Sequence, residues 1–281
     1  MVLLTTSCGV DKKVNRFFNQ VKSVPDKLTD IFDIDMSIGN FRLLATDEPF
    51  TYDRIKSAHI VFSKLEVKDI SGSFHPGPNR EMELDLAKLR NGRYTIMADF
   101  NLPPGEYVEI KLHVKEASII LSNDKKVDVL VPKSATEGFS VSFPMKLIVS
   151  DKGSNDFLID FNLAKTFLPR GDLTDLDKVT AFDFVPLTRL SNLHTAGAVG
   201  GKILSSDKTA LVGALIEINH DKWSASALSE GEGYFAIIGL PDGKYEAKVS
   251  APGHIEQKNI SVKVEEGKVT PFGTILIKNT L

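Results

Sequence analysis

The stretch Phe139-Ser140-Val141-Ser142-Phe143-Pro144-Met145-Lys146-Leu147-Ile148-Val149 decides the fold class of this chain. Nearly every second residue in it is apolar, and successive side chains of a β-strand point to opposite faces of the sheet. We therefore predict a strand with one face on a core and the other in water, as in antiparallel sheets. The residues predicted to face the core are Phe139, Val141, Phe143, Met145, Leu147 and Val149.

Period-two alternation also marks other parts of the chain. Residues 108–114 carry apolar side chains at even positions, and residues 157–163 carry them at odd positions. Within residues 58–67 the apolar positions change from even to odd: Ala58, Ile60 and Phe62 are followed by Leu65 and Val67. One extra residue reverses the face on which later side chains lie, so this pattern predicts a β-bulge or a break.

Turn-forming residues separate the predicted strands. They are Asp47-Glu48-Pro49, His75-Pro76-Gly77-Pro78, Asn91-Gly92, Pro103-Pro104-Gly105 and Lys152-Gly153. Many short strands at such spacing are typical of a β-sandwich or a small barrel. The one helical pattern in this region, Leu84, Leu86 and Leu89, fits a single turn before Asn91-Gly92.

Length and composition limit the classes of function. The chain has 281 residues, which at about 150 residues per domain predicts two domains. Its net charge is −3 and its Lys and Arg residues are spread along the chain, so we expect no nucleic-acid partner. No apolar run reaches the roughly 18 residues that a membrane-spanning helix needs.

The only cysteine, Cys8, follows Met1-Val2-Leu3-Leu4-Thr5-Thr6-Ser7 and precedes Gly9. This segment resembles the end of a bacterial lipoprotein signal peptide, in which the cysteine is diacylated and becomes the first mature residue. It has no basic n-region and its apolar part is shorter than the usual ~7–15 residues, so we expect the true start to lie upstream. The alternative is a free thiol that packs as a small apolar side chain. Gly9 is compatible with sorting to the outer membrane in the lipoproteins that the segment resembles.

The predicted domain organisation follows from these patterns. Within residues 8–36, apolar residues recur at helical spacing: Val14, Phe17, Phe18, Val21 and Val24. That segment is interpreted as a spacer, as a helix that docks on a partner, or as a helix that caps the neighbouring β-domain. The predicted parts are a signal-peptide remnant (1–7), a spacer that is helical or extended (8–36), a first β-domain (37–190), a linker (191–198) and a second β-domain (199–281).

Four motifs of the first β-domain carry a resemblance to a known family. They are Leu43-Leu44-Ala45-Thr46-Asp47-Glu48-Pro49 with Tyr52-Asp53, the stretch from Leu84 to Gly92, the stretch from Leu102 to Leu112, and Phe184-Val185-Pro186-Leu187-Thr188-Arg189-Leu190. In this order they resemble the domain of unknown function 4382 family. The resemblance implies an exported bacterial lipoprotein and, because the family carries no established catalytic residues, it implies no catalytic site.

The second β-domain is similar to the carboxypeptidase regulatory-like, transthyretin-like β-sandwich. The similarity rests on Gly200-Gly201-Lys202-Ile203, Ala210 to Ile218, Gly231 to Leu240, Pro241 to Val249 and Ala251-Pro252-Gly253-His254. The fold class predicted for the chain is therefore all-β, with two antiparallel β-sandwich domains, the second transthyretin-like or immunoglobulin-like, and a short N-terminal helical or extended segment.

One motif occurs once in each domain. Leu240-Pro241-Asp242-Gly243-Lys244-Tyr245 repeats the pattern of Leu102-Pro103-Pro104-Gly105-Glu106-Tyr107. Proline and glycine favour a tight turn. We predict that each copy forms a turn that starts a strand and is anchored by its tyrosine.

Residues with reactive or metal-binding side chains form no recognisable motif. The chain lacks a nucleophile elbow, a phosphate loop and a zinc-binding helix motif, and its six histidines have no metal-ligand spacing. We therefore predict no catalytic residue, no metal ligand and no cofactor. His113 is interpreted as a solvated residue on the polar face of its strand. Asp172, Asp175, Asp177 and Asp183 carry oxygens that Ca²⁺ prefers, but without calcium-loop spacing a solvated loop is the favoured interpretation.

The single tryptophan, Trp223, is the candidate ligand-binding residue. It lies in His220-Asp221-Lys222-Trp223-Ser224, where turn and strand patterns meet. An exposed indole on a sandwich loop can stack on a sugar ring. The alternative, which we favour, is a tryptophan that packs on the core.

The expected function is that of a non-catalytic, membrane-anchored lipoprotein, a structural or adhesive accessory subunit of a bacterial cell-envelope or surface complex. Its expected partners are the membrane, through a lipid on Cys8, and proteins of the envelope, in the periplasm or at the surface. The alternative is a glycan-binding surface protein that recognises polysaccharide through Trp223. An enzyme with an unrecognised site is the third interpretation, since fold alone never excludes catalysis.

Overall fold

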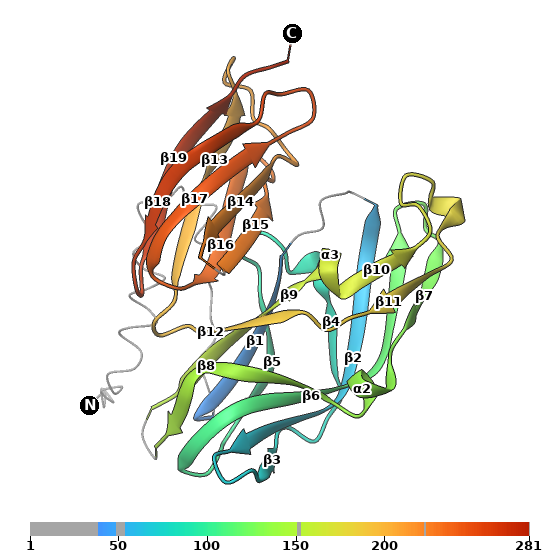
Figure 1. Ribbon diagram of the computed structural model, residues 1–281, viewed down its shortest axis with the longest axis vertical. Helices are drawn as coiled ribbons and strands as arrows, with labels where there is room; N and C mark the ends of the chain where they lie inside the picture. The colour runs from blue at the N-terminus through green and yellow to red at the C-terminus, as the bar shows by residue number, and fades with distance from the viewer. Residues whose placement is uncertain (1–38, 49–53, 151–152, 222, 281) are drawn as a thin grey trace, which may run out of the picture.

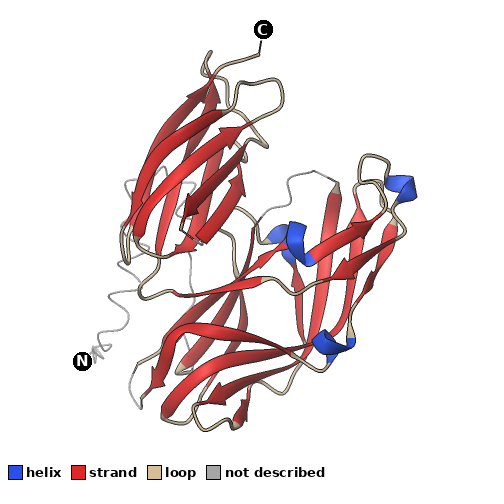
Figure 2. Ribbon diagram, viewed as in Figure 1, coloured by secondary structure: helices blue, strands red, loops and turns tan. Residues whose placement is uncertain are grey.

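A computed structural model describes residues 39–48, 54–150, 153–221 and 223–280. Strands dominate this part of the chain, and its helices are single turns (Figure 2). The short helices are η3 (Leu86–Lys88), α2 (Lys133–Thr136), α3 (Leu163–Thr166) and η4 (Leu176–Lys178). In the described ranges no helix has the length and apolarity to cross a membrane. The all-β prediction is confirmed, whereas the predictions for residues 1–36, including Cys8, lie outside the described residues.

The first domain contains the strands up to β12 (Figure 1). Its sheets have the orders β12-β9-β1-β5 and β10-β11-β7-β6-β2-β3, with β4 paired to β2 and β8 paired to β6. The bounds are β1 (Phe41–Glu48), β2 (Ile55–Asp69), β3 (Phe74–Pro76), β4 (Met82–Asp85), β5 (Thr95–Phe100), β6 (Gly105–Leu121), β7 (Lys126–Leu130), β8 (Phe139–Val149), β9 (Asn155–Asn162), β10 (Phe167–Arg170), β11 (Ala181–Phe184) and β12 (Thr188–Asn192).

Aromatic side chains join the two sheets of the first domain into one core. Phe143 of β8 contacts Phe157 of β9 at 4.8 Å between ring centroids, and Phe62 of β2 lies 6.0 Å from Phe161. The predicted change of face in β2 is confirmed, because the pairing with β6 shifts register on both sides of Phe62. The bulge keeps both the even-numbered and the odd-numbered apolar residues of β2 buried, from Ala58 to Val67. The predicted helical turn is η3.

The repeated proline–tyrosine motif forms the same structure in both domains. The hydroxyl of Tyr107 donates a hydrogen bond to the carbonyl oxygen of Pro103 at 2.7 Å, and that of Tyr245 donates to Pro241 at 2.9 Å. Both rings are fully buried. Each tyrosine therefore anchors the turn that starts its strand, as predicted.

The second domain is a sandwich of two sheets, with the orders β16-β13-β19 and β15-β14-β17-β18. Its strands are β13 (Gly197–Ser205), β14 (Leu215–His220), β15 (Trp223–Leu228), β16 (Tyr234–Leu240), β17 (Gly243–Ser250), β18 (Gln257–Val264) and β19 (Val269–Ile277). Phe235, Tyr245 and the aliphatic side chains of both sheets form its core. β12 ends at Asn192 and β13 begins at Gly197, so only residues 193–196 connect the domains outside strands.

The sequence predicts antiparallel pairing throughout, and the structure departs from this prediction in part. Three pairs in the described strands are parallel: β1 with β9, β11 with β7, and β13 with β19. Parallel partners need a long crossover, and they place a strand such as β9 in the middle of a sheet with both faces covered.

The two domains share an apolar interface, here called the seam. Odd-numbered residues of β9 face the core of the first domain, whereas Leu158 faces the second domain. Leu158 and Leu44 form one buried cluster with Ala198, Ala236 and Ile238. A buried apolar interface of this kind restrains relative motion of domains.

Hydrogen bonds and ion pairs reinforce the seam. Asn91, at a positive φ of 61° in the predicted Asn91-Gly92 turn, accepts a hydrogen bond from the Ala236 amide at 2.7 Å. Glu230 pairs with Arg93, and Ser191 donates from its hydroxyl to the Gly239 carbonyl at 2.6 Å. The turn that the sequence predicted thus also docks the first domain onto β16.

Candidate functional site

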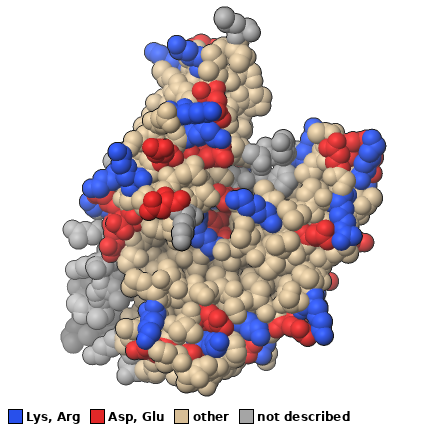
Figure 3. All heavy atoms as spheres, in the orientation of Figure 1, with Lys and Arg blue, Asp and Glu red and all other residues tan. Residues whose placement is uncertain are grey.

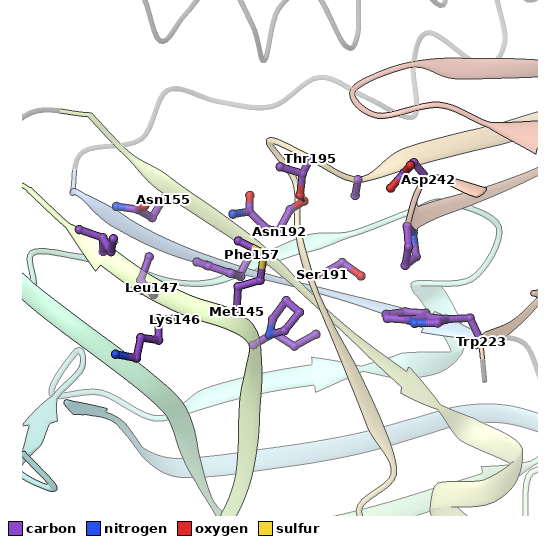
Figure 4. Close-up of a pocket in the computed structure, with 15 residues that line it drawn as sticks. Met145, Lys146, Leu147, Asn155, Phe157, Ser191, Asn192, Thr195, Trp223 and Asp242 are labelled. Carbon is purple, nitrogen blue, oxygen red and sulfur yellow. Dashed lines mark hydrogen bonds between the residues drawn. The ribbon is translucent and has the colours of Figure 1, made fainter. Parts of the chain in front are cut away.

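A groove of about 300 Å³ lies where the two domains meet. The first domain contributes β8, β9 and the end of β12, and the second contributes Trp223 and the turn before β17 (Figure 4). We call it the interdomain groove. Its lining residues are Pro144, Met145, Lys146, Leu147, Ile148, Asn155, Phe157, Leu190, Ser191, Asn192, Thr195, Ala196, Trp223, Pro241 and Asp242.

Two large apolar side chains of the groove lie in the open. Met145 is 78% exposed and Ile148 is 67% exposed. The prediction that Met145 faces the core is therefore wrong, although Val141, Phe143, Leu147 and Val149 are buried as predicted.

A bulge in β8 explains why Met145 points outward. Leu147 pairs with Tyr107 and Ser142 pairs with Glu109, so one residue of β6 faces four residues of β8 between these pairs. Pro144 is one of these four residues of β8, and it has no N–H to donate to β6. The extra residues turn Met145 away from the core and into the groove.

Trp223 forms one end of the interdomain groove, with Asn155 toward the other end (Figure 4). It is the first residue of β15 and is partly buried against the core of the second domain. The guanidinium of Arg189 lies 5.1 Å from the centroid of its ring. Arg189 also donates a hydrogen bond to the carbonyl oxygen of Ser224 at 2.6 Å. One ring face is thus held by a cation–π contact, and the indole is positioned rather than free to rotate.

Polar groups line the groove beside its apolar floor. Asn155, Asn192 and Asp242 contribute amide and carboxylate groups, and Asp242 is exposed and forms no ion pair with another described residue. Lys146 is paired with Glu106 at 3.0 Å. An apolar pocket with a few polar groups at a domain boundary is the usual form of a ligand-binding site.

A buried carboxyl group, that of Asp160, lies on the other side of Trp223 and interacts electrostatically with the buried Asp47. Asp160 of β9 pairs with Arg189 and lines a smaller pocket of about 260 Å³ that Trp223 also borders. Burial raises the pKa of Asp160 to about 6, although the Arg189 guanidinium acts in the opposite direction. Burial and the neighbouring Asp160 charge raise the pKa of Asp47 well above its usual value. Asp160 therefore carries a proton-dependent charge beside Trp223, outside the lining of the interdomain groove.

The other residues singled out in the sequence lie away from the groove. His113 is not simply solvated, because its ring is 2.9 Å from a carboxylate oxygen of Glu66 and largely covered. Asp183 pairs with Arg170, and Asp175 pairs with Lys178. In the part of the chain that the structure describes, no group of three or more His, Cys, Asp or Glu residues could hold a metal ion.

Two family models match the chain. Residues 38–174 match the Domain of unknown function (DUF4382), and residues 198–276 match the Carboxypeptidase regulatory-like domain. The chain therefore contains a region similar to DUF4382, followed by a region similar to the carboxypeptidase regulatory-like domain. The interdomain groove therefore lies between the DUF4382 domain and the carboxypeptidase regulatory-like domain. No curated protein matches the chain.

Solved structures show only a distant likeness. A type II cohesin–X-dockerin complex from Acetivibrio cellulolyticus matches 30% of this chain and 58% of its own at 22% identity and a TM-score of 0.26. The match to the Bacillus anthracis TIE protein covers 92% of this chain and 44% of that protein, at 12% identity and a TM-score of 0.29. The match to the minor pilin GBS52 of Streptococcus agalactiae covers 86% of this chain and 97% of that protein, at 14% identity and a TM-score of 0.25. The chain spans about half the length of the first two, and TM-scores this low carry no argument about function.

Proposed function

We propose that this protein is a non-catalytic binding protein of the bacterial cell envelope, a structural or adhesive accessory subunit of an envelope or surface complex. The observation that carries the proposal is the interdomain groove with its exposed Met145 and Ile148. Exposed apolar groups gathered in a concave surface favour binding of a partner. Methionine is well suited to such a surface because its flexible thioether adapts to different shapes.

The seam supports binding by a preformed surface. Leu44 and Leu158 are fully buried against the carboxypeptidase regulatory-like domain, so the two walls of the groove are held in fixed positions. A surface that is already ordered loses less conformational entropy when a partner binds.

The groove chemistry supports binding rather than bond cleavage. Among the described lining residues the ionisable side chains are those of Lys146 and Asp242, and neither a histidine nor a cysteine belongs to this set. The hydroxyl of Ser191 donates to the backbone oxygen of Gly239, so it is engaged in the seam. Nucleophilic catalysis needs a base within hydrogen-bond reach of the nucleophile, and this lining provides no such pair.

The proposal includes a lipid on Cys8, which would place the protein on a membrane of the cell envelope, in the periplasm or at the surface. Two acyl chains give durable anchoring, at about 0.8 kcal/mol per buried CH₂ group. Mass spectrometry of the protein from its native host tests this part, and an unmodified Cys8 would contradict it. Nucleic acid is not among the proposed partners, since Lys and Arg side chains mix with Asp and Glu on the face shown in Figure 3.

The test of the proposed function is photocrosslinking in intact cells. A photoreactive amino acid replaces Met145 in the groove or, as a matched control, the exposed Leu130 on β7. We expect one envelope protein to be captured reproducibly from Met145 and not from Leu130. Equal capture at both positions, or capture at neither, would refute a partner site in the groove.

Glycan binding is the second candidate function, and the position of Trp223 favours it. One face of the indole holds Arg189, while the ring also borders a groove that carries Asn155, Asn192 and Asp242. Aromatic rings with nearby amides and carboxylates suit sugar rings and their hydroxyl groups. On a glycan array, Trp223→Ala should abolish binding while Trp223→Phe retains part of it. Unchanged binding by Trp223→Ala would exclude the stacking role.

A further inference from the structure

The apolar floor of the interdomain groove is an exposed surface that the described residues leave uncovered. Met145 and Ile148 are mostly exposed, and they adjoin Pro144 and the groove wall formed by Phe157. A soluble domain gains stability when such a surface is covered. The question is which chain covers it.

The chain itself enters the fold at the edge of this groove. Asn155 lines the groove, and both its backbone N–H and its side-chain amide donate to the carbonyl oxygen of Asn40, at 2.9 Å and 3.0 Å. Gly39 precedes Asn40 directly, and its N–H donates to the Asp99 carboxylate at 2.7 Å. Every residue before Gly39 is therefore tethered next to the Asn155 end of the groove.

The sequence before Gly39 contains an apolar stripe. Its apolar residues at helical spacing are Val14, Phe17, Phe18, Val21 and Val24. Fourteen residues separate the last of them from Gly39, and an extended chain of that length spans about 50 Å. Reach is therefore sufficient for this stripe to lie anywhere along a pocket of about 300 Å³.

Charge also favours this occupant over an acidic one. Lys12 and Lys13 precede the stripe, and Arg16 lies within it. The exposed carboxylate of Asp242 lies at the Trp223 end of the groove and forms no ion pair within the described residues. A basic segment can pair with this carboxylate while its apolar residues contact Met145.

We propose that the apolar side chains of residues 14–24 of the same chain cover the exposed floor of the interdomain groove when no partner is bound. The inference rests on the groove being the binding surface proposed above, but it does not require an external partner. Tethering raises the local concentration of the segment to the millimolar range. A partner must then displace the segment, so its apparent affinity is lower than the groove alone would give.

The first test is a disulfide crosslink in the full chain with Cys8 replaced by serine. Phe18→Cys is combined with Met145→Cys, and the matched control combines Phe18→Cys with Leu130→Cys. Met145 lies opposite Val108 of β6, and Leu130 lies two residues beyond Asp128, which pairs with Ser118. About eight residues of β6 therefore separate the two target positions, or roughly 26 Å along the strand. We expect at least ten times more intrachain crosslink with Met145→Cys, measured by tryptic mass spectrometry.

The second test uses Trp223, the only tryptophan, as a reporter at the groove. Replacing Phe17 and Phe18 by serine in the full chain should double the quenching of Trp223 by acrylamide. The matched control replaces Asn15 and Asn19, between the apolar positions, and should leave the quenching unchanged. A peptide of residues 11–27 should reverse the effect in the first variant.

The outcomes separate this inference from the proposed function. Equal crosslinking at both target positions, or no change in quenching, overturns occupancy by the segment. Crosslinks between chains rather than within one chain also overturn it, in favour of a second copy. Each of these results leaves the photocrosslinking test in cells unaffected, because that test reports on an external partner.

Discussion

Leu158→Ala should destabilise both domains, although the residue belongs to the DUF4382 domain. The side chain is fully buried, and it packs in the seam with Ala236 and Ile238 of the carboxypeptidase regulatory-like domain. A Cβ atom placed on Gly239 would lie 2.8 Å from one methyl group of Leu158, which shows how closely the two domains approach. Truncation therefore leaves a cavity between the domains.

The size of the effect follows from the burial of the side chain. Leu→Ala substitutions at buried sites cost about 2–5 kcal/mol, and the rigid strands on both sides of Leu158 limit collapse of the cavity. We expect a loss of about 3 kcal/mol in the free energy of unfolding. At a urea dependence of roughly 2–3 kcal/mol per molar, the midpoint should fall by about 1 M.

Two probes of urea unfolding test whether the seam couples the domains. Trp223 fluorescence reports the carboxypeptidase regulatory-like domain, and far-ultraviolet circular dichroism reports both domains. We expect both midpoints to fall together in Leu158→Ala, and to stay unchanged in the control Val212→Ala, whose side chain is exposed and lies outside the groove. A Trp223 midpoint that stays at the wild-type value in Leu158→Ala would refute coupling through the seam.

Three further substitutions test the tyrosine-anchored turn before β17, the glycine turn before β16 and the buried carboxyl group of Asp160. Tyr245→Phe removes the hydrogen bond to Pro241 and should cost about 1 kcal/mol in urea unfolding; no loss would show that the hydroxyl does not anchor the turn. Gly233→Ala should cost at least about 2 kcal/mol, since Gly233 has a φ of +87° and a Cβ atom would lie 2.3 Å from the Ile203 carbonyl oxygen; a thermal midpoint within 1 °C of wild type would contradict this geometry. Asp160 has a folded pKa of about 6, above its unfolded value of 3.8, so its contribution to stability is complete below about pH 4 and is lost as pH rises through 6. That contribution is about 3 kcal/mol, and Asp160→Asn should flatten the fall in stability between pH 4 and 7; an unchanged pH profile would remove Asp160 as its source.

Much of the fold could be predicted because single domains bury one face of each strand. The alternation in β8 and β9, the bulge in β2 and the tyrosine-anchored turns depend on residues close in sequence. For the same reason the odd-numbered residues of β9, such as Phe157, were assigned correctly to the core.

The seam could not be predicted from the sequence, because alternation does not reveal what covers the second face of a strand. Arg42, Asp156 and Asp160 occupy positions that would face water in an isolated domain, yet all three are buried. Arg42 pairs with Asp156 at 2.8 Å, which compensates part of the cost of their burial. Only the arrangement of the two domains creates that environment.

The sequence does not predict the interdomain groove itself. Trp223 stood out as the single tryptophan, and it lines the groove. Alternation does not reveal that Met145 is exposed, because Met145 occupies an odd-numbered position like its buried neighbours Phe143 and Leu147. Pro144 was the available signal, since a proline within a strand indicates an edge or a bulge.

The parallel pairing of β1 with β9 has a consequence for synthesis on the ribosome. Arg42 and its partner Asp156 are 114 residues apart, so β1 leaves the exit tunnel long before β9 exists. At about 5–20 residues per second, β1 waits several seconds or more with only β5 as a neighbour in its sheet. Cotranslational folding of the first domain therefore finishes late, and a nascent chain stalled before residue 155 should bind chaperones more strongly than one stalled after residue 192.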